Sequence, residues 1–257
     1  MLDGRFPNRR LFPPGELGVM AAIVEEVLDE WIARVMVHYR WHYDENALHV
    51  LSNVSGRRLK LSELQDFEIY RWGPRACRAT GTELRSQQRV AEDEYIGMMG
   101  MLENQLASTR YALGDRPSAI DAMLLGGLRA HTLADPIPDL SRFEKILAWE
   151  KFCDQGWDGH GDWAPFPEST PFANHMISIA EAEYKPFVLG NARALHSKKK
   201  IFDITTYGEK TTYLTRDSPE RSRKILKRFS YDVLTNSELA SADSWLAKTN
   251  LAELFTS

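Results

Sequence analysis

The chain has 257 residues, 43% of them hydrophobic and 26% charged, which is an ordinary composition for a globular domain. Its 32 Lys and Arg residues against 36 Asp and Glu residues leave a net charge of −4, so no electrostatic reason favours nucleic acid or an anionic membrane as a partner. Only two cysteines, Cys77 and Cys153, are present, which excludes a disulfide framework. Without a signal peptide or an apolar run of about 18 residues, we expect a cytoplasmic protein that does not enter a membrane.

The first half of the chain predicts two long helices. Residues 1–15 carry three prolines and no periodicity, so we expect an extended lead-in. From Glu16 to about Tyr43, apolar residues recur at helical spacing, and the same pattern predicts a helix over residues 83–108. Between them we expect a loop over residues 52–58 and a short helix within residues 59–72, which the pair Gly73-Pro74 would end.

A capping signal opens the next helix. Gly114 begins a turn, and Ser118 stands three residues before Asp121, so the Asp121 carboxylate and the Ser118 hydroxyl are predicted to form a capping box. The residues that follow are apolar all round, which predicts a fully buried helix. Two adjacent glycines, Gly126 and Gly127, reduce helix propensity, and we attribute them to the close approach of another helix.

The second half predicts shorter elements. We expect a short helix over residues 140–152, an ordered loop over residues 157–167, and a helix over residues 171–195 that Pro186 kinks. Residues 201–206 and 210–214 alternate around Gly208-Glu209 and predict a β-hairpin. A helix capped by Ser218 and a final amphipathic segment over about residues 237–255 complete the chain. The prediction is therefore an all-α fold with one β-hairpin near residues 201–214, organised as a lead-in (1–15) and one helical domain (16–257).

Few residues suggest chemistry by their spacing. His38 and His42, with Asp44 near, have the i,i+4 spacing of a metal pair, but no third ligand is evident, and we predict no metal. They mark either a helix end that a neighbour partly covers or the border of a ligand cleft. Asp158, His160 and Asp162 lie in one loop, where they form either a hydrolytic or metal site or simply turn geometry.

Three further features have a simple structural interpretation. Ser118, Asp121 and His131 cannot form a triad, because two of them cap a helix and His131 lies about three turns further along it. Cys77 stands between Arg75 and Arg78, so its thiol has either a lowered pKa or no reactivity. Lys198, Lys199 and Lys200 indicate a solvated approach to the hairpin.

The segment from Gly114 to Pro136 resembles the G-x-x-x-S/T-x-x-D capping-box helix at the centre of the C-terminal, all-helical domain of the glutathione transferase superfamily. Gly114, Ser118 and Asp121 fill the positions of that motif, and residues 25–41 resemble the first long helix of the same domain. The resemblance extends approximately from Leu2 to Phe229. It implies a bundle of this type, whose first long helix faces the active-site cleft.

The resemblance also implies what the chain would bind. It places a hydrophobic ligand subsite on the first long helix, at Trp31, Arg34, His38, Tyr39 and Trp41. In this superfamily the residues that activate glutathione lie in a thioredoxin-like domain, to which nothing in residues 1–257 corresponds. No catalytic residue can therefore be assigned, no cofactor is expected to be bound, and glutathione is a cosubstrate by resemblance only.

The resemblance leaves two functions open. In the first, the chain is the helical half of a glutathione transferase, or of a related lyase or isomerase, whose thioredoxin-like half is truncated, separately encoded or lost. In the second, it is a non-catalytic binding or assembly module. The partners expected are a small hydrophobic ligand and either a second copy of the chain or a separate thioredoxin-like protein.

Overall fold

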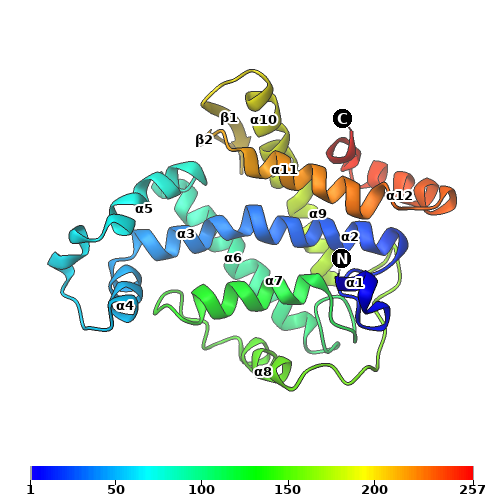
Figure 1. Ribbon diagram of the computed structural model, residues 1–257, viewed down its shortest axis with the longest axis horizontal. Helices are drawn as coiled ribbons and strands as arrows, with labels where there is room; N and C mark the ends of the chain where they lie inside the picture. Colours follow the sequence, from blue (N-terminus) through cyan, green and yellow to red (C-terminus); the bar gives the residue numbers. More distant parts are fainter. Residues whose placement is uncertain (1, 257) are drawn as a thin grey trace.

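One long helix crosses the computed structural model, which describes residues 2–256 (Figure 1). It consists of α2, a π-helical segment and α3, over Gly15–Glu26, Val27–Ile32 and Ala33–His42. Four helices pack against α2: α7 (Ala119–Gly127), α9 (Pro171–Ile179), α11 (Asp217–Leu226) and α12 (Asn236–Lys248). Two others, α5 (Glu68–Ala79) and α6 (Arg85–Gln105), pack against α3. Because neighbours surround it, side chains around most of α2 are buried, including Val19, Met20, Ala21, Ile23 and Val24. The predicted helix from Glu16 to about Tyr43 is confirmed.

The lead-in is helical in part, which corrects the prediction of an extended segment. It forms two short turns, α1 and a 3-10 turn, over Leu2–Arg5 and Pro7–Arg9. The Asp3 carboxylate accepts hydrogen bonds from the amides of Leu11 and Phe12, at 3.0 and 2.9 Å. The Ala119 amide donates to the Leu11 carbonyl, so the lead-in is tied to the start of α7. These bonds supply local partners that propensity alone does not reveal.

Residues 44–79 form a helical extension, drawn at the left of Figure 1. Its elements are α4, a 3-10 helix and α5, over Asp44–Ser55, Leu61–Asp66 and Glu68–Ala79. Ala47, Leu51, Leu59 and Leu64 form a small second core within it. Helix α4 was not predicted from the sequence, and the predicted helix end at Gly73-Pro74 is wrong, since α5 continues through Pro74. Proline removes one backbone donor there, and the packing of α5 on α3 outweighs that loss.

The capping box opens α7, which follows α6. The two helices span Ala119–Gly127 and Arg85–Gln105, and α7 continues as a π-helical segment over Leu128–Thr132. The reciprocal capping pattern of Ser118 and Asp121 is present. The prediction of a fully buried α7 is wrong, because Ala122, Gly126, Arg129 and Ala130 are exposed. Its buried face contains Ile120, Leu124 and Leu128.

Only one of the two α7 glycines meets a neighbour. A Cβ atom at Gly127 would lie 2.4 Å from Cε of Met36 in α3, so the predicted close approach holds for this position. At Gly126 the space within 4 Å is empty, so the explanation fails for Gly126.

The second half of the chain follows the predicted order. Helix α8 and a 3-10 turn span Glu144–Phe152 and Cys153–Gln155. After the loop, α9, a π-helical segment and α10 form one continuous helical run over Pro171–Ile179, Ala180–Tyr184 and Lys185–His196. Pro186 stands at the start of α10, directly after the π-helical segment. Because proline has no backbone N–H, one helical hydrogen bond is missing there, and the wider π-helical turn accommodates that loss.

The predicted hairpin is confirmed. Strands β1 and β2 span Ile201–Thr206 and Glu209–Leu214, and they pair antiparallel with Ile201 opposite Leu214. The remaining elements are α11, a π-helical segment, α12 and a 3-10 turn, over Asp217–Leu226, Lys227–Tyr231, Asn236–Lys248 and Ala252–Phe255. Ser218 lies inside α11 and Arg216 takes the cap position without a side-chain bond, so the predicted Ser218 cap is wrong. Among the described residues, no helix is both long and apolar enough to span a bilayer.

Candidate functional site

The predicted ligand surface of the long helix is covered by the rest of the chain. Trp31, Arg34, His38 and Tyr39 are only 1–3% exposed, whereas Trp41 is half-buried. The Trp31 ring lies 5.6 Å from Phe187 of α10, centroid to centroid, and close to the hairpin. The expectation that these residues border an open cleft is therefore wrong for all but Trp41. Periodicity identified an apolar face correctly but did not show that α5, α6, α10 and the hairpin cover it.

A buried ion pair holds the centre of this face. The Arg34 guanidinium donates to Glu94 of α6 at 2.7 Å, and the Trp31 indole N–H donates to the other Glu94 oxygen at 3.0 Å. Burial raises the pKa of the Glu94 carboxyl, and the adjacent Arg34 charge opposes that rise. Nearby, Glu183 accepts the backbone amide of Tyr207 in the hairpin, and burial raises its pKa to about 7. The Glu94 contacts connect α6 to the long helix, and the Glu183 contact connects the hairpin to the π-helical segment between α9 and α10.

A chain of hydrogen bonds leads from the core to the surface at the end of α3. The Nδ1 atoms of His38 and His42 are 2.7 Å apart, and Nε2 of His38 is 2.6 Å from the Glu92 carboxylate. The Tyr43 hydroxyl donates to the same Glu92 oxygen at 2.7 Å. When His38 donates to Glu92 through Nε2, its Nδ1 accepts from His42, and Nε2 of the exposed His42 is left as a proton acceptor.

This arrangement favours a proton relay over a metal pair. The Nδ1 atoms of His38 and His42 face each other across one hydrogen bond, so they do not converge on a shared ion. Within residues 2–256 no group of three or more His, Cys, Asp or Glu side chains is arranged to hold a metal. Burial lowers the pKa of both imidazoles, which favours their neutral forms.

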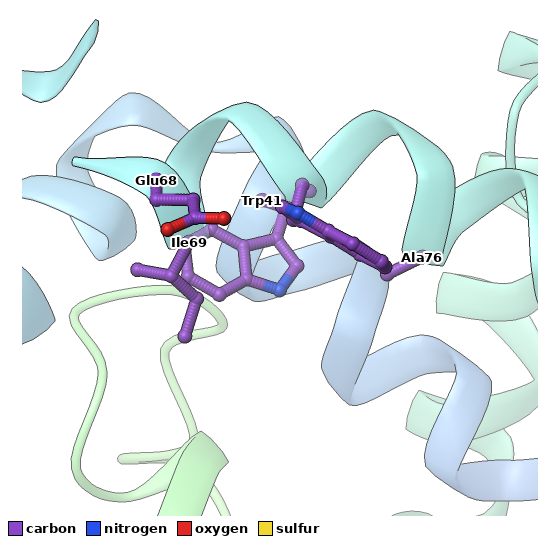
Figure 2. A pocket seen from close by; sticks show the side chains of 6 residues that line it. Trp41, Glu68, Ile69 and Ala76 are labelled. Atoms are coloured by element: carbon purple, nitrogen blue, oxygen red, sulfur yellow. The ribbon is translucent and has the colours of Figure 1, made fainter. Parts of the chain in front are cut away.

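An apolar groove lies between α3 and α5 (Figure 2). It has a volume of about 550 Å³ and is lined by Trp41, Glu68, Ile69, Trp72, Gly73 and Ala76. A Cβ atom at Gly73 would lie 2.9 Å from Cβ of Trp41, so glycine permits the close contact of the two helices. Ile69 and Trp72 are each 55% exposed, and their apolar surface is open to a ligand.

The groove combines two indoles with one carboxylate. Trp41 comes from α3 and Trp72 from α5, and the Glu68 carboxylate lies at the edge of the space that they line (Figure 2). The Arg75 guanidinium lies 5.2 Å from the Trp72 ring centroid and holds that indole by a cation–π contact. Indole faces stack well on planar aromatic molecules, so the groove is suited to an apolar aromatic ligand.

The α5 half of this groove was not predicted from the sequence. Glu68, Trp72 and Ala76 recur every four residues and lie on one helical face, which is a recognisable signal. The expected helix end at Gly73-Pro74 divided that pattern and concealed it.

The remaining candidate residues have structural roles. The Asp121 carboxylate accepts the amides of Ala112 and Ser118, each at 2.8 Å, and burial raises its pKa to about 6. His131 lies apart from this pair, beside Arg40 and Asp135. The cap thus explains both Ser118 and Asp121 without a triad.

The loop candidates and the cysteines also show no reactive arrangement. Asp158 accepts a hydrogen bond from the amide of His160 and pairs with Arg110, both at 2.9 Å. These contacts are turn geometry, the second of the two alternatives given for this loop. Burial raises the pKa of the Cys77 thiol to about 11 and that of Cys153 to about 12. A lowered Cys77 pKa is therefore contradicted, and neither thiol is a thiolate near neutral pH.

Comparison of the chain with protein-family models, with curated proteins and with solved structures found no match.

Proposed function

We propose that this chain is a ligand-binding helical domain of the glutathione transferase C-terminal type, and that it holds an apolar aromatic molecule in the groove between α3 and α5. The observation that carries the ligand proposal is the pair of indoles, Trp41 and Trp72, around an accessible space of about 550 Å³. Volumes of about 300–1,000 Å³ are usual for sites that bind small molecules.

The relation to the superfamily rests on the sequence motif and on an order of helices consistent with it. A long first helix, α2–α3, packs against α7, and α7 begins with the Ser118–Asp121 capping box. Under this proposal, conjugation to glutathione depends on a thioredoxin-like half, which supplies the donor that activates the thiol. Glutathione is then a cosubstrate only of the combined unit.

The alternative is a non-catalytic binding or assembly module. The extension formed by α4 and α5 favours it, because several large apolar side chains there are more than half exposed: Val54, Leu61, Ile69 and Trp72. A second copy of the chain, or a separate thioredoxin-like protein, would remove this surface from water.

A titration of tryptophan fluorescence with 1-chloronaphthalene tests the ligand proposal. We expect saturable quenching in the unaltered chain and a loss of affinity of about tenfold in Trp72→Ala, since stacking and apolar burial both disappear. Phe6→Ala is the matched control, because Phe6 is 59% exposed in the lead-in and does not line the groove. Equal affinity in both variants would contradict the proposal.

Two further measurements separate the functions. Calorimetry with glutathione and turnover of a chlorinated aromatic test the thiol chemistry, and we expect weak or absent binding and no turnover in this chain alone. Micromolar glutathione binding with turnover would contradict the dependence on a thioredoxin-like half. Analytical ultracentrifugation tests the assembly module, which predicts a dimer that Trp72→Ala dissociates.

A further inference from the structure

The positive charge of the chain is concentrated in one segment. Residues 185–228 contain twelve Lys or Arg residues and four Asp or Glu residues, so their net charge is +8 although the whole chain carries −4. This segment forms α10, the hairpin and α11, which lie together in the upper part of Figure 1. A basic surface on an acidic protein attracts anions to that surface rather than to the protein in general.

A groove of about 690 Å³ lies between α10 and α11 within this segment. Its apolar surface includes Leu195 of α10 and Ile225 of α11, together with Phe229, one helical turn further on. Ile225 and Phe229 are 49% and 57% exposed, while Leu226, on the adjacent face of the same helix, is buried against the bundle. The helix is thus apolar on two faces, and the bundle covers only one of them.

Cations alternate with these apolar residues. Arg221, Ile225, Arg228 and Phe229 stand at positions i, i+4, i+7 and i+8, so they lie on one helical face, and all four line the groove. Such a face offers apolar surface and positive charge side by side.

The two arginines are not paired with the acidic residues of the groove, and the Arg228 guanidinium lies 5.5 Å from the Phe229 ring centroid. Glu220, which also lines the groove, is shared by Arg223 and Lys224, with N–O distances of 2.8 and 3.2 Å. Among the described residues, the salt bridges include neither Arg221 nor Arg228. The second acidic residue of the groove, Asp217, lies in the first turn of α11, where the helix dipole favours a negative charge.

We propose that this groove binds a small amphipathic anion. Its alkyl or aryl body lies on Leu195, Ile225 and Phe229, and its carboxylate, sulfonate or phosphate group lies between Arg221 and Arg228. The site lies between helices other than those of the α3–α5 groove, so it is independent of the function proposed above. A recess of this volume fits one molecule, which favours a free ligand over a lipid surface.

Calorimetry with decanoate at low ionic strength tests the proposal. We expect decanoate to bind at a single site, 1-decanol to bind at least tenfold more weakly, and inorganic phosphate alone to bind at least tenfold more weakly. The double variant R221E/R228E is expected to lose at least tenfold in decanoate affinity, since charge-assisted contacts to the anion become repulsive. Phe229→Ala, which keeps both charges, is expected to lose about fivefold.

The matched control is R85E/R89E, which makes the same change of net charge at two exposed positions of α6. Its affinity is expected to stay within twofold of the unaltered chain, and equal thermal midpoints would show that all variants fold. Equal decanoate affinity in R221E/R228E and R85E/R89E would overturn the proposal. So would decanol or phosphate binding as tight as decanoate, or binding only to vesicles of anionic lipid and not to free decanoate.

Discussion

Replacing Asp121 by alanine tests the structural role of the capping box most directly. The variant removes one acceptor from three hydrogen bonds, which come from the Ala112 amide, the Ser118 amide and the Ser118 hydroxyl, all at 2.8 Å. Ala112 and Ser118 are 0% and 1% exposed, so water cannot replace the lost acceptor. Each buried donor left unpaired costs about 1–3 kcal/mol.

Two opposing terms set the net effect of Asp121→Ala. Two backbone donors left unpaired cost roughly 2–6 kcal/mol. Against this, burial outweighs these hydrogen bonds and raises the Asp121 pKa from 3.8 to about 6, so ionisation of Asp121 is about 3 kcal/mol less favourable in the folded chain than in the unfolded chain. The net loss of unfolding free energy at pH 7 is therefore at most about 3 kcal/mol. For a chain of this length, 2 kcal/mol lowers the melting temperature by about 4–8 °C.

The pH dependence of this loss has a definite sign. Because the Asp121 pKa is raised by folding, the folded state binds its proton more tightly than the unfolded state does. The contribution of Asp121 is fully present below its ordinary pKa of 3.8 and falls as the pH rises through about 6. The penalty of Asp121→Ala should therefore be larger at pH 4 than at pH 7.

Thermal and urea denaturation of Asp121→Ala, at both pH values, measure these quantities. Ser118→Ala is expected to be milder, about 1 kcal/mol, because Asp121 still accepts both amides. The control is Asp93→Ala on α6, which removes an exposed carboxylate. Surface substitutions usually change stability by about 0.5 kcal/mol or less, so the melting temperature should stay within about 2 °C. An unchanged melting temperature in Asp121→Ala, together with a lost activity, would refute the capping role and indicate a catalytic pair.

Other perturbations have equally definite outcomes. Burial raises the Glu26 pKa from 4.5 to about 8, so the folded state binds its proton more tightly than the unfolded state does. The free energy of unfolding therefore falls as the pH rises between these values, by at most about 5 kcal/mol. In urea titrations, Glu26→Gln should show a smaller fall over the same pH range. Equal pH profiles in the two proteins would contradict this. Gly126→Ala should raise the melting temperature, because alanine adds up to about 1 kcal/mol of helix propensity and its Cβ atom enters open space. Gly127→Ala should raise the melting temperature less, because its Cβ atom displaces the Met36 side chain. A larger gain at Gly127 would show that the Met36 contact is unimportant.

Local chemistry determined several elements from the sequence alone. The capping box required only Ser118 and Asp121, three residues apart, whose groups bond within one helical turn. The hairpin required only alternation on either side of a turn, where Tyr207 and Gly208 adopt φ of 50° and 75°. The long helix over Gly15–His42 required only the spacing of its apolar residues. Each signal lies within a few residues, so no knowledge of distant contacts was needed.

Tertiary structure decided which predicted faces are open. Periodicity shows that Trp31 and Arg34 share one side of a helix, but it cannot show that Glu94, 60 residues away from Arg34, meets them there. Likewise, the isolated pair Gly73-Pro74 predicts a helix end, whereas the contact of Gly73 with Trp41 makes continuation favourable. The groove lined by Trp41 and Trp72 exists only because α5 packs on α3. Burial is a sum over neighbours distant in sequence, and only the folded chain supplies it.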